Sequence, residues 1–352
     1  MDVEEATARV PMRWVGPIKI GGKVVDGEVE VPLATYESPL WPSVGRGAKM
    51  SRLSERGILA TLVDERMTRS VLLEADDAET AVAAVRQLND DLPELRRLVS
   101  ERSRFAELVT MNHQIAGNLL FLRLEFTTGD ASGHNMATLA ADVLLTYIVA
   151  SVPGLRYSSV SGNYCTDKKA TAVNGILGRG KNVVAELLIP REVVEERLRT
   201  TARKVADLNV RKNLIGTTLA GGIRSANAHF ANMLLAVYLA TGQDAANIVE
   251  GSQGITHAED RDGALYFSTT LPNLIVGTVG NGKGLDFVDA NLTRMGCRES
   301  REPGANARRL AAIIAATVLC GELSLMAAQT NPGELMRAHL RLERATPEKE
   351  AV

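Results

Sequence analysis

Residues 161–169 are the most informative stretch of the chain, because they combine an acid, two lysines and small polar residues between two apolar runs. A strand-like run over 155–160 precedes them, and an apolar run with a glycine break over 170–177 follows. A polar segment between apolar ones is normally a surface loop, in which Asp167 and Lys168 would form a weak ion pair. A partly buried lysine could instead face an anion. The loop is therefore a candidate site whose partners the rest of the chain must supply.

Composition and charge exclude several classes of protein. The chain has 352 residues, 45% hydrophobic and 23% charged, as in ordinary soluble globular proteins. The net charge of -2, from 40 basic and 42 acidic residues, argues against a general nucleic-acid or polybasic membrane binder. Three widely separated cysteines predict no disulfide framework, and the polar start differs from a signal peptide. The longest apolar run, over 310–320, is too short to span a bilayer, so we expect a cytoplasmic protein.

Residues 70–160 alternate between strand and helix patterns. We expect strands over 70–75, 107–111, 120–126 and 155–160, and helices over 78–100 and 133–150. Asp76 is the expected cap of the first helix, with Glu79 as its capping-box partner. The order β-α-β-β-α-β is the split ferredoxin-like arrangement, and its length suits a small inserted domain.

The remainder of the chain is expected to form a large, mainly helical domain, which makes the fold class α+β. Glycine, proline and alternating Val and Ile predict short strands over 10–31, followed by a loop over 31–50. Long helices are predicted over 191–208 and 306–329, and a strand over 271–284 runs into a glycine-rich turn.

Several polar residues have an ordinary structural explanation beside a functional one. The small-residue turn at 129–136 lies before a predicted helix, where free N–H groups suit a phosphate. It lacks the G-x-G-x-x-G pattern, so by chemistry alone an ordinary turn is the better explanation. His229 shares a helix face with Asn232, although a buried histidine bonded to a carbonyl group is the usual case. Asp244 follows a predicted helix end, where it can cap.

Five segments together resemble 3-hydroxy-3-methylglutaryl-CoA reductase (HMG-CoA reductase), over about 31–344. The most specific is SGNYCTDKK at 161–169, which continues to GRGK at 178–181. The others are PLATYE at 32–37, DASGHNM at 130–136, NAH at 227–229 with GQD at 242–244, and GTVG at 277–280. Five matches in the family's order within one chain make the resemblance strong.

The resemblance implies a role for each matching residue. The family's catalytic acid, lysine, aspartate and histidine correspond to Glu37, Lys168, Asp244 and His339. Positions that hold the hydroxymethylglutaryl group correspond to Arg69, Ser161, Lys212 and Asn232, and positions near the substrate and coenzyme A to Ser43, Arg46 and His229. The nicotinamide-cofactor region corresponds to Ser103, Arg104, Phe105, Asp130, Gly133, Asn135 and Gly280; no metal is implied.

The resemblance also implies an architecture and partners. A large domain (1–69 and 160–330) around a central helix would carry the substrate site, an inserted non-Rossmann domain (70–159) the cofactor, and a mobile segment (331–352) His339. Family members complete the active site across a dimer interface, so we expect a homodimer or a dimer-based oligomer. The implied substrate is HMG-CoA and the products are mevalonate and CoA, in isoprenoid precursor synthesis. Arg104 beside Ser103 favours NADPH over NADH, because arginine pairs well with a 2′-phosphate.

Some positions depart from the family's pattern or carry a further expectation. His134 stands where many members have a methionine. Ala345 replaces the phosphorylatable serine of regulated, membrane-anchored members, so we expect a short, soluble, unregulated form. The peptide bond that corresponds to Cys165–Thr166 is cis in the family, which we expect here.

The implied reaction requires residues of these types. Reduction of a thioester to an alcohol takes two hydride transfers and releases CoA between them. The Lys168 ammonium can stabilise the charge that grows on the carbonyl oxygen, while Glu37 can protonate the alkoxide and His339 the leaving thiolate. Arg69 and Lys212 can pair with the substrate carboxylate. The division of protons among the catalytic groups stays open at this stage.

Two other functions also stay open from the sequence. One is the reverse reaction, an NAD-linked oxidation of mevalonate. The other is a non-catalytic CoA-thioester binding protein on the same fold, against which the presence of all four catalytic residue types argues.

Overall fold

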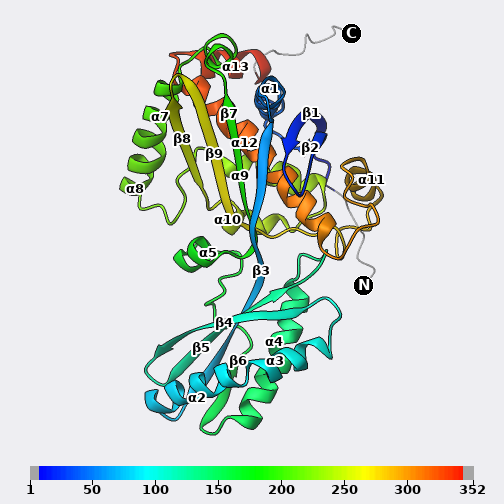
Figure 1. The fold of residues 1–352 in the computed structure, drawn as a ribbon, viewed down its shortest axis with the longest axis vertical. Coiled ribbons are helices and arrows are strands. Elements are labelled where there is room, and N and C mark those ends of the chain that lie inside the picture. The colour runs from blue at the N-terminus through cyan, green and yellow to red at the C-terminus, as the bar shows by residue number, and fades with distance from the viewer. Residues whose placement is uncertain (1–7, 344–352) are drawn as a thin grey trace, which may run out of the picture.

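The protein consists of two parts connected by one long strand (Figure 1). The structure is a computed structural model that describes residues 8–343, without the side chains of 338, 339 and 341–343. Ala345 therefore lies outside the described residues. The strands are β1 (Met12–Gly21), β2 (Gly27–Ala34), β3 (Ile58–Ala75), β4 (Glu107–Ala116), β5 (Leu119–Thr127), β6 (Leu155–Ser159), β7 (Gly180–Ile189), β8 (Ile255–Arg261) and β9 (Ala264–Leu274).

The helices fill the spaces between the strands and cover them. They are α1 (Leu40–Leu53), α2 (Ala78–Asp90), α3 (Leu92–Ser100), α4 (His134–Ser151), α5 (Ala172–Leu177), α6 (Arg191–Val193), η1 (Val194–Leu198), α7 (Ala202–Leu208), η2 (Asn209–Gly216), α8 (Thr217–Leu219), α9 (Phe230–Ala240), η3 (Ala245–Asn247), α10 (Ile248–Gly251), α11 (Asp286–Arg294), α12 (Ala305–Gln329) and α13 (Glu334–Glu343).

Strand β3 belongs to both parts. Its first half pairs with β1 and antiparallel to β7, with Leu59 opposite Glu186. Its second half pairs antiparallel with β5 and β6, with Val71 opposite Leu122. Two separate apolar clusters form, one on each half. The pairing partners of β3 therefore change where the chain passes from one part to the other (Figure 1).

The larger part is built around α12. Nearly every side chain of this helix from Leu310 to Ala328 is buried, and β1, β2, β7 and β9 contribute to the same apolar cluster. Within the described residues, α12 is the one helix long and apolar enough to cross a bilayer, and 94% of its most apolar window is buried inside the protein. A helix that is apolar all round is typical of the core of a large protein.

Helix α1 crosses α12 in close contact at Gly47. A Cβ atom added there would lie 2.2 Å from the backbone oxygen of Cys320, so no side chain fits without moving a helix backbone. We expect Gly47→Ala to lower the free energy of unfolding by about 1–3 kcal/mol, the usual cost of overpacking. Thermal unfolding measures this loss. Gly45→Ala in the same helix is the matched control, since its Cβ would meet only the Val15 side chain at 3.7 Å, and an equal loss there would contradict the packing argument.

The smaller part contains the strands and helices that the sequence predicts. The sheet order is β4-β5-β3-β6 with every neighbouring pair antiparallel, and helices α2, α3 and α4 contribute their buried faces to its apolar cluster. The single helix expected over 78–100 is wrong: α2 ends at Asp90 and α3 begins at Leu92, because Pro93 is tolerated only in the first turn of a helix. The cap is Asp77 rather than Asp76, with its carboxylate accepting from Thr80 N at 2.7 Å.

The larger part has more residues in helices than in strands, as expected, but it also contains a sheet that the sequence predicted only in part. Six strands, in the order β2-β1-β3-β7-β9-β8, form its sheet. Short apolar runs such as β7 do not distinguish a strand from a buried helix by periodicity. The expected loop over 31–50 contains most of α1, the expected strand over 271–284 ends at Leu274, and the expected helix over 191–208 is interrupted at Arg199, whose φ is 54°. After this interruption α7 begins at Ala202, and Thr201 is its N-cap.

Candidate functional site

The loop at 161–169 presents Lys168 to Asp244, and the two form an ion pair with 2.8 Å between Lys168 Nζ and Asp244 Oδ2. Asp244 lies just beyond α9 and also caps η3 through its contact with Ala246 N at 3.1 Å. Lys168 has a φ of 57°, a left-handed conformation that is uncommon for a residue with a side chain. The two sequence-predicted residues therefore lie together.

The loop turns by left-handed residues rather than by a cis peptide bond. Among the described residues the cis bond is Gly16–Pro17, so the expectation for Cys165–Thr166 is wrong. Thr166 instead has a φ of 41°, and its carbonyl oxygen accepts from Asn174 Nδ2 at 3.0 Å. Cys165 is buried and unpaired.

The electrostatics of the Lys168–Asp244 pair favour both charged forms. The hydrogen bond that the Lys168 ammonium donates to Asp244 raises the pKa of Lys168 above its ordinary value, against a smaller opposing effect of burial. Burial raises the pKa of Asp244, but the hydrogen bonds from Lys168 and from the N–H of Ala246 outweigh it, and the net shift is downward. The pair is nevertheless open to solvent, with 43% and 44% of the two side chains exposed.

This coupling gives a pH prediction. We expect Asp244→Asn to lower the pKa of Lys168, because it removes the largest cause of the upward shift. The raised pKa keeps the ammonium charged to higher pH. In the variant this upward shift is lost, so Lys168 should lose its proton at a lower pH than in the wild type. NMR titration of the Lys168 Nζ signal measures this. Asp207→Asn, which breaks a pair with Arg203 elsewhere on the surface, should leave the titration unchanged; an unchanged pKa in Asp244→Asn would contradict the coupling.

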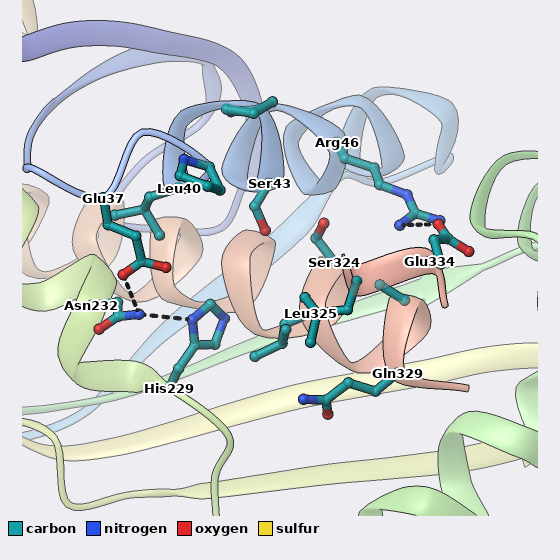
Figure 2. Close-up of a pocket in the computed structure, with 14 residues that line it drawn as sticks. Glu37, Leu40, Ser43, Arg46, His229, Asn232, Ser324, Leu325, Gln329 and Glu334 are labelled. Carbon is teal, nitrogen blue, oxygen red and sulfur yellow. Dashed lines mark hydrogen bonds and ion pairs between the residues drawn. The ribbon is translucent and has the colours of Figure 1, made fainter. Parts of the chain in front are cut away.

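A second group of predicted residues lines a pocket of about 420 Å³ at the start of α9 (Figure 2). Asn232 Nδ2 donates to Glu37 Oε2 at 2.9 Å and lies 3.4 Å from His229 Nδ1. The other ring nitrogen of His229 lies 3.0 Å from the carbonyl oxygen of Gly321, the ordinary partner of such a histidine. Ser43 and Arg46 line the same pocket, the latter paired with Glu334 of α13 at 3.1 Å.

The two groups lie at opposite ends of α9. Asn232 is in its first turn, and Asp244 follows its last residue by four positions. At about 1.5 Å per residue, the helical residues 232–240 alone span about 12 Å. No hydrogen bond or ion pair described within the chain joins Glu37 to Lys168 or Asp244. One chain therefore keeps Glu37 apart from the lysine and aspartate with which we expected it to act.

The remaining substrate residues are dispersed around these groups. Arg69 donates through Nε to Val160 O at 3.2 Å, which places it beside the start of the loop, and Ser161 is exposed there. Lys212 lies in η2, where burial lowers its pKa and the Glu322 carboxylate partly restores it. His339 lies in α13, but its side chain is outside the described part of the structure.

Two of the predicted cofactor residues, Phe105 and Asp130, line a pocket of about 300 Å³ beside the start of α4, together with Val279 and others. The exposed Arg104 guanidinium lies 5.5 Å from the Phe105 ring centroid, and Ser103 Oγ accepts from Phe105 N at 3.2 Å. Gly133 precedes α4 with a φ of 93°; Asn135 in the first turn and Gly280 after β9 are exposed.

Asp130 has a structural task that the sequence did not predict. Its carboxylate accepts from Gly304 N at 3.0 Å and Ala307 N at 2.9 Å, so it caps α12 from the loop before α4. Its backbone oxygen also accepts from Thr278 N at 2.8 Å. Asp130 thus connects the smaller part of the fold to the central helix of the larger part.

Three buried acidic or basic residues were given no role from the sequence: Arg179 and Glu250 beside the loop, and Glu322 beside the start of α9. Glu322 lies in the middle of α12, where its carboxylate accepts from the backbone N–H groups of Ala228 at 2.6 Å and His229 at 3.0 Å. A single acid inside an otherwise apolar helix was the available signal. Arg179 belongs to the GRGK stretch at 178–181 that carries part of the resemblance, but no role was given to it. Glu250 lies outside the matching segments and has no comparable signal.

Comparison with known proteins identifies the family of the chain. The family model of hydroxymethylglutaryl-coenzyme A reductase matches residues 5–344. The chain belongs to the HMG-CoA reductase family. A 3-hydroxy-3-methylglutaryl-coenzyme A reductase from Pyrococcus horikoshii is 45% identical over 340 residues, 96% of this chain and 81% of that protein. One from Haloferax volcanii is 41% identical over 337 residues, 96% of this chain and 83% of that protein.

Solved structures agree with the fold. The class II HMG-CoA reductase of Streptococcus pneumoniae, solved bound to NADPH in open conformations, aligns with a TM-score of 0.74 and 20% identity, covering 94% of this chain and 88% of that one. At this identity the likeness shows the fold alone, which is mixed α+β. The resemblance and the oxidoreductase class predicted from the sequence are confirmed by the family match.

Proposed function

We propose that this member of the HMG-CoA reductase family reduces HMG-CoA to mevalonate and CoA with NADPH as the hydride donor. The observation that carries the proposal is the Lys168–Asp244 pair, whose lysine lies in the segment that most specifically matches the family. An ammonium held by a carboxylate is the group that the reaction needs opposite the thioester oxygen. Cytoplasmic location and the exact limits of the two domains, 70–159 for the smaller one, are parts of the same proposal.

Lys168 is the proposed stabiliser of the developing oxyanion. Its pKa is raised by Asp244, so the ammonium stays charged at neutral pH while negative charge grows on the carbonyl oxygen. Glu37 is the proposed proton donor to the alkoxide; Asn232 orients it through the 2.9 Å hydrogen bond. We assign His339 to protonation of the leaving thiolate by its family position.

Arg69 and Lys212 are proposed to bind the substrate carboxylate. Lys212 is partly buried, and burial lowers its pKa, whereas an incoming carboxylate would raise the pKa and favour the charged form. Arg46 and Ser43 line the pocket that contains Glu37 and are proposed to contact the substrate or CoA. The Arg46–Glu334 ion pair then connects this pocket to α13, the helix that carries His339.

The residues beside α4 fit a nicotinamide dinucleotide. The helix begins without a side-chain cap, so its first N–H groups are free for a phosphate, and the adjoining pocket offers the exposed ring of Phe105. Arg104 is exposed and suited to a 2′-phosphate. The cofactor would supply the hydride. The antiparallel order β4-β5-β3-β6 supports a ferredoxin-like smaller domain for this role, and Asp130 stabilises its contact with α12.

The complete active site is proposed to form between two copies of the chain. Within one chain, Glu37 and the Lys168–Asp244 pair lie at opposite ends of α9, yet the proposed reaction requires both at one substrate. The pair is also more than 40% exposed, although an ammonium stabilises an oxyanion strongly only where water is excluded. A second copy that covers the pair and brings its own Glu37 satisfies both requirements, with the twofold symmetry typical of homodimers.

Initial rates with each cofactor test the proposal. HMG-CoA should be consumed faster with NADPH than with NADH, and mevalonate oxidation with NAD should be the slower direction under the same conditions. A purified protein that binds HMG-CoA without oxidising either cofactor would instead be the non-catalytic binder. Faster turnover with NADH would refute the assignment of Arg104 to a 2′-phosphate.

A further inference from the structure

Arg179 lies at the centre of a buried group of polar residues beneath the Lys168 loop. Its side chain is 1% exposed. One guanidinium nitrogen lies 3.0 Å from Asp167 Oδ1 and 2.9 Å from Glu250 Oε1, and Nε donates to Thr68 Oγ1 at 3.2 Å. Arg179 thereby connects the loop, α10 and β3, which are far apart in the sequence.

Glu250 connects Arg179 to the backbone of Lys168. Its side chain is fully buried, and Oε1 accepts from the backbone N–H of Lys168 at 3.1 Å and from Asn247 Nδ2 at 2.9 Å. The left-handed backbone of Lys168 costs energy for a residue with a Cβ and persists only when its surroundings hold it. The hydrogen bond to Glu250 stabilises this backbone conformation, from which the Lys168 side chain extends to Asp244.

The charges of this group are balanced by Arg179. Burial raises the pKa of Glu250, and among the opposing effects are the N–H of Lys168 and the positive charge of Arg179. Asp167, adjacent to Lys168 in the chain, faces the same guanidinium. Without Arg179, two carboxylates would stand beside the loop with no buried cation between them, which is a costly arrangement.

The pKa of His134 depends on the same charges. As the first residue of α4, it places Nε2 3.7 Å from Asp167 Oδ1. Burial lowers the pKa of His134, and Arg179 lowers it further; Asp167 and Asp244 raise it, and Lys168 lowers it. Removal of the Arg179 charge should therefore raise the pKa of His134. A loss of packing that exposed the ring would raise it too, so Arg179→Lys, which keeps a positive charge, distinguishes the two causes.

We propose that Arg179 is a positioning residue for Lys168: it holds Asp167 and Glu250, and these fix the left-handed backbone from which the ammonium reaches Asp244. This inference rests on the role of Lys168 in the proposed reduction. With 1% of its side chain exposed, Arg179 would act through the residues that it holds and not by contact with substrate or cofactor. Its effect on turnover is transmitted through the loop.

Steady-state kinetics of Arg179→Met test the positioning role. We expect kcat with HMG-CoA and NADPH to fall about 10²-fold, the scale of a misplaced catalytic group, with a much smaller change in KM. Arg179→Lys should fall less, because a compact ammonium cannot bridge both carboxylates. Arg123→Met is the matched control: this arginine is also fully buried, but pairs with Glu125 and with Gly178 O, and should keep its kcat per folded molecule. Unchanged kcat in Arg179→Lys and Arg179→Met, or an equal loss in Arg123→Met, overturns the proposal.

Titration of His134 by NMR separates this inference from the proposed function. The signal is assigned by its absence in His134→Met. An upward shift of its pKa in Arg179→Met, together with a pKa close to that of the wild type in Arg179→Lys, supports the charge arrangement. An unchanged pKa in Arg179→Met, or an equal upward shift in both variants, overturns it. If wild-type protein oxidises no NADPH with HMG-CoA, the proposed function fails, whereas the titration still decides whether Arg179 balances Asp167.

Discussion

Lys168→Ala should reduce turnover of HMG-CoA by about 10²–10³-fold, the usual cost of removing one group that stabilises an oxyanion. The ammonium pairs with Asp244, and the alanine variant should leave the left-handed backbone and its hydrogen bond to Glu250 in place. Since the Lys168 side chain is 43% exposed, its loss should leave the fold and thermal unfolding nearly unchanged. Single-turnover oxidation of NADPH measures the hydride step directly.

Lys169→Ala provides the matched control for this experiment. Lys169 is the next residue, is also exposed, and donates to the carbonyl oxygen of Asp167 at 3.1 Å instead of pairing with a carboxylate. It should turn over at the wild-type rate. Near-normal turnover of Lys168→Ala, or equal losses in the two variants, would remove Lys168 from the mechanism.

Mixing two inactive variants should restore activity. Glu37→Gln and Lys168→Ala each disable every site in a homodimer of one variant. If each site takes Glu37 from one copy and Lys168 from the other, a mixed dimer has one intact site and one doubly altered site. Random exchange makes about half of the dimers mixed, so about a quarter of the wild-type activity should return. The measurement is NADPH oxidation after the two variants are unfolded and refolded together.

A second mixture controls for nonspecific recovery. Lys168 and Asp244 pair within one chain, so Lys168→Ala and Asp244→Asn damage the same half of a site. That mixture should remain as inactive as its components. Recovery in both mixtures, or in neither, would contradict the division of the active site between two copies of the chain.

The sequence predicted the parts of the fold in which local pattern and tertiary packing agree. The alternation over 120–126 and the uninterrupted apolar pattern of α12 led to the correct elements. Helix α1 was missed because its glycines resemble a loop, while Gly47 is needed for close contact with Cys320, a residue far away in the chain. Tertiary contacts of this kind leave no local signal.

The candidate site was predicted residue by residue, but its geometry was not. The motifs predicted Lys168 and Asp244, and the structure brings them within 2.8 Å. Sequence order gave no reason to expect that α9 separates Glu37 from them, because the helix length matters only once both groups are positioned in space. Arg179, although part of the GRGK stretch, and Glu250 were given no role, because their importance comes from burial beside Lys168, which composition and spacing do not report.

The ratio of NADPH oxidised to CoA thiol released tests the central claim most directly. Reduction of HMG-CoA to mevalonate transfers two hydrides and frees one thiol, so the wild-type protein with HMG-CoA and excess NADPH should consume two NADPH for each thiol detected. A ratio of one, which stops at the aldehyde, or thiol release without NADPH oxidation would contradict the proposed reduction.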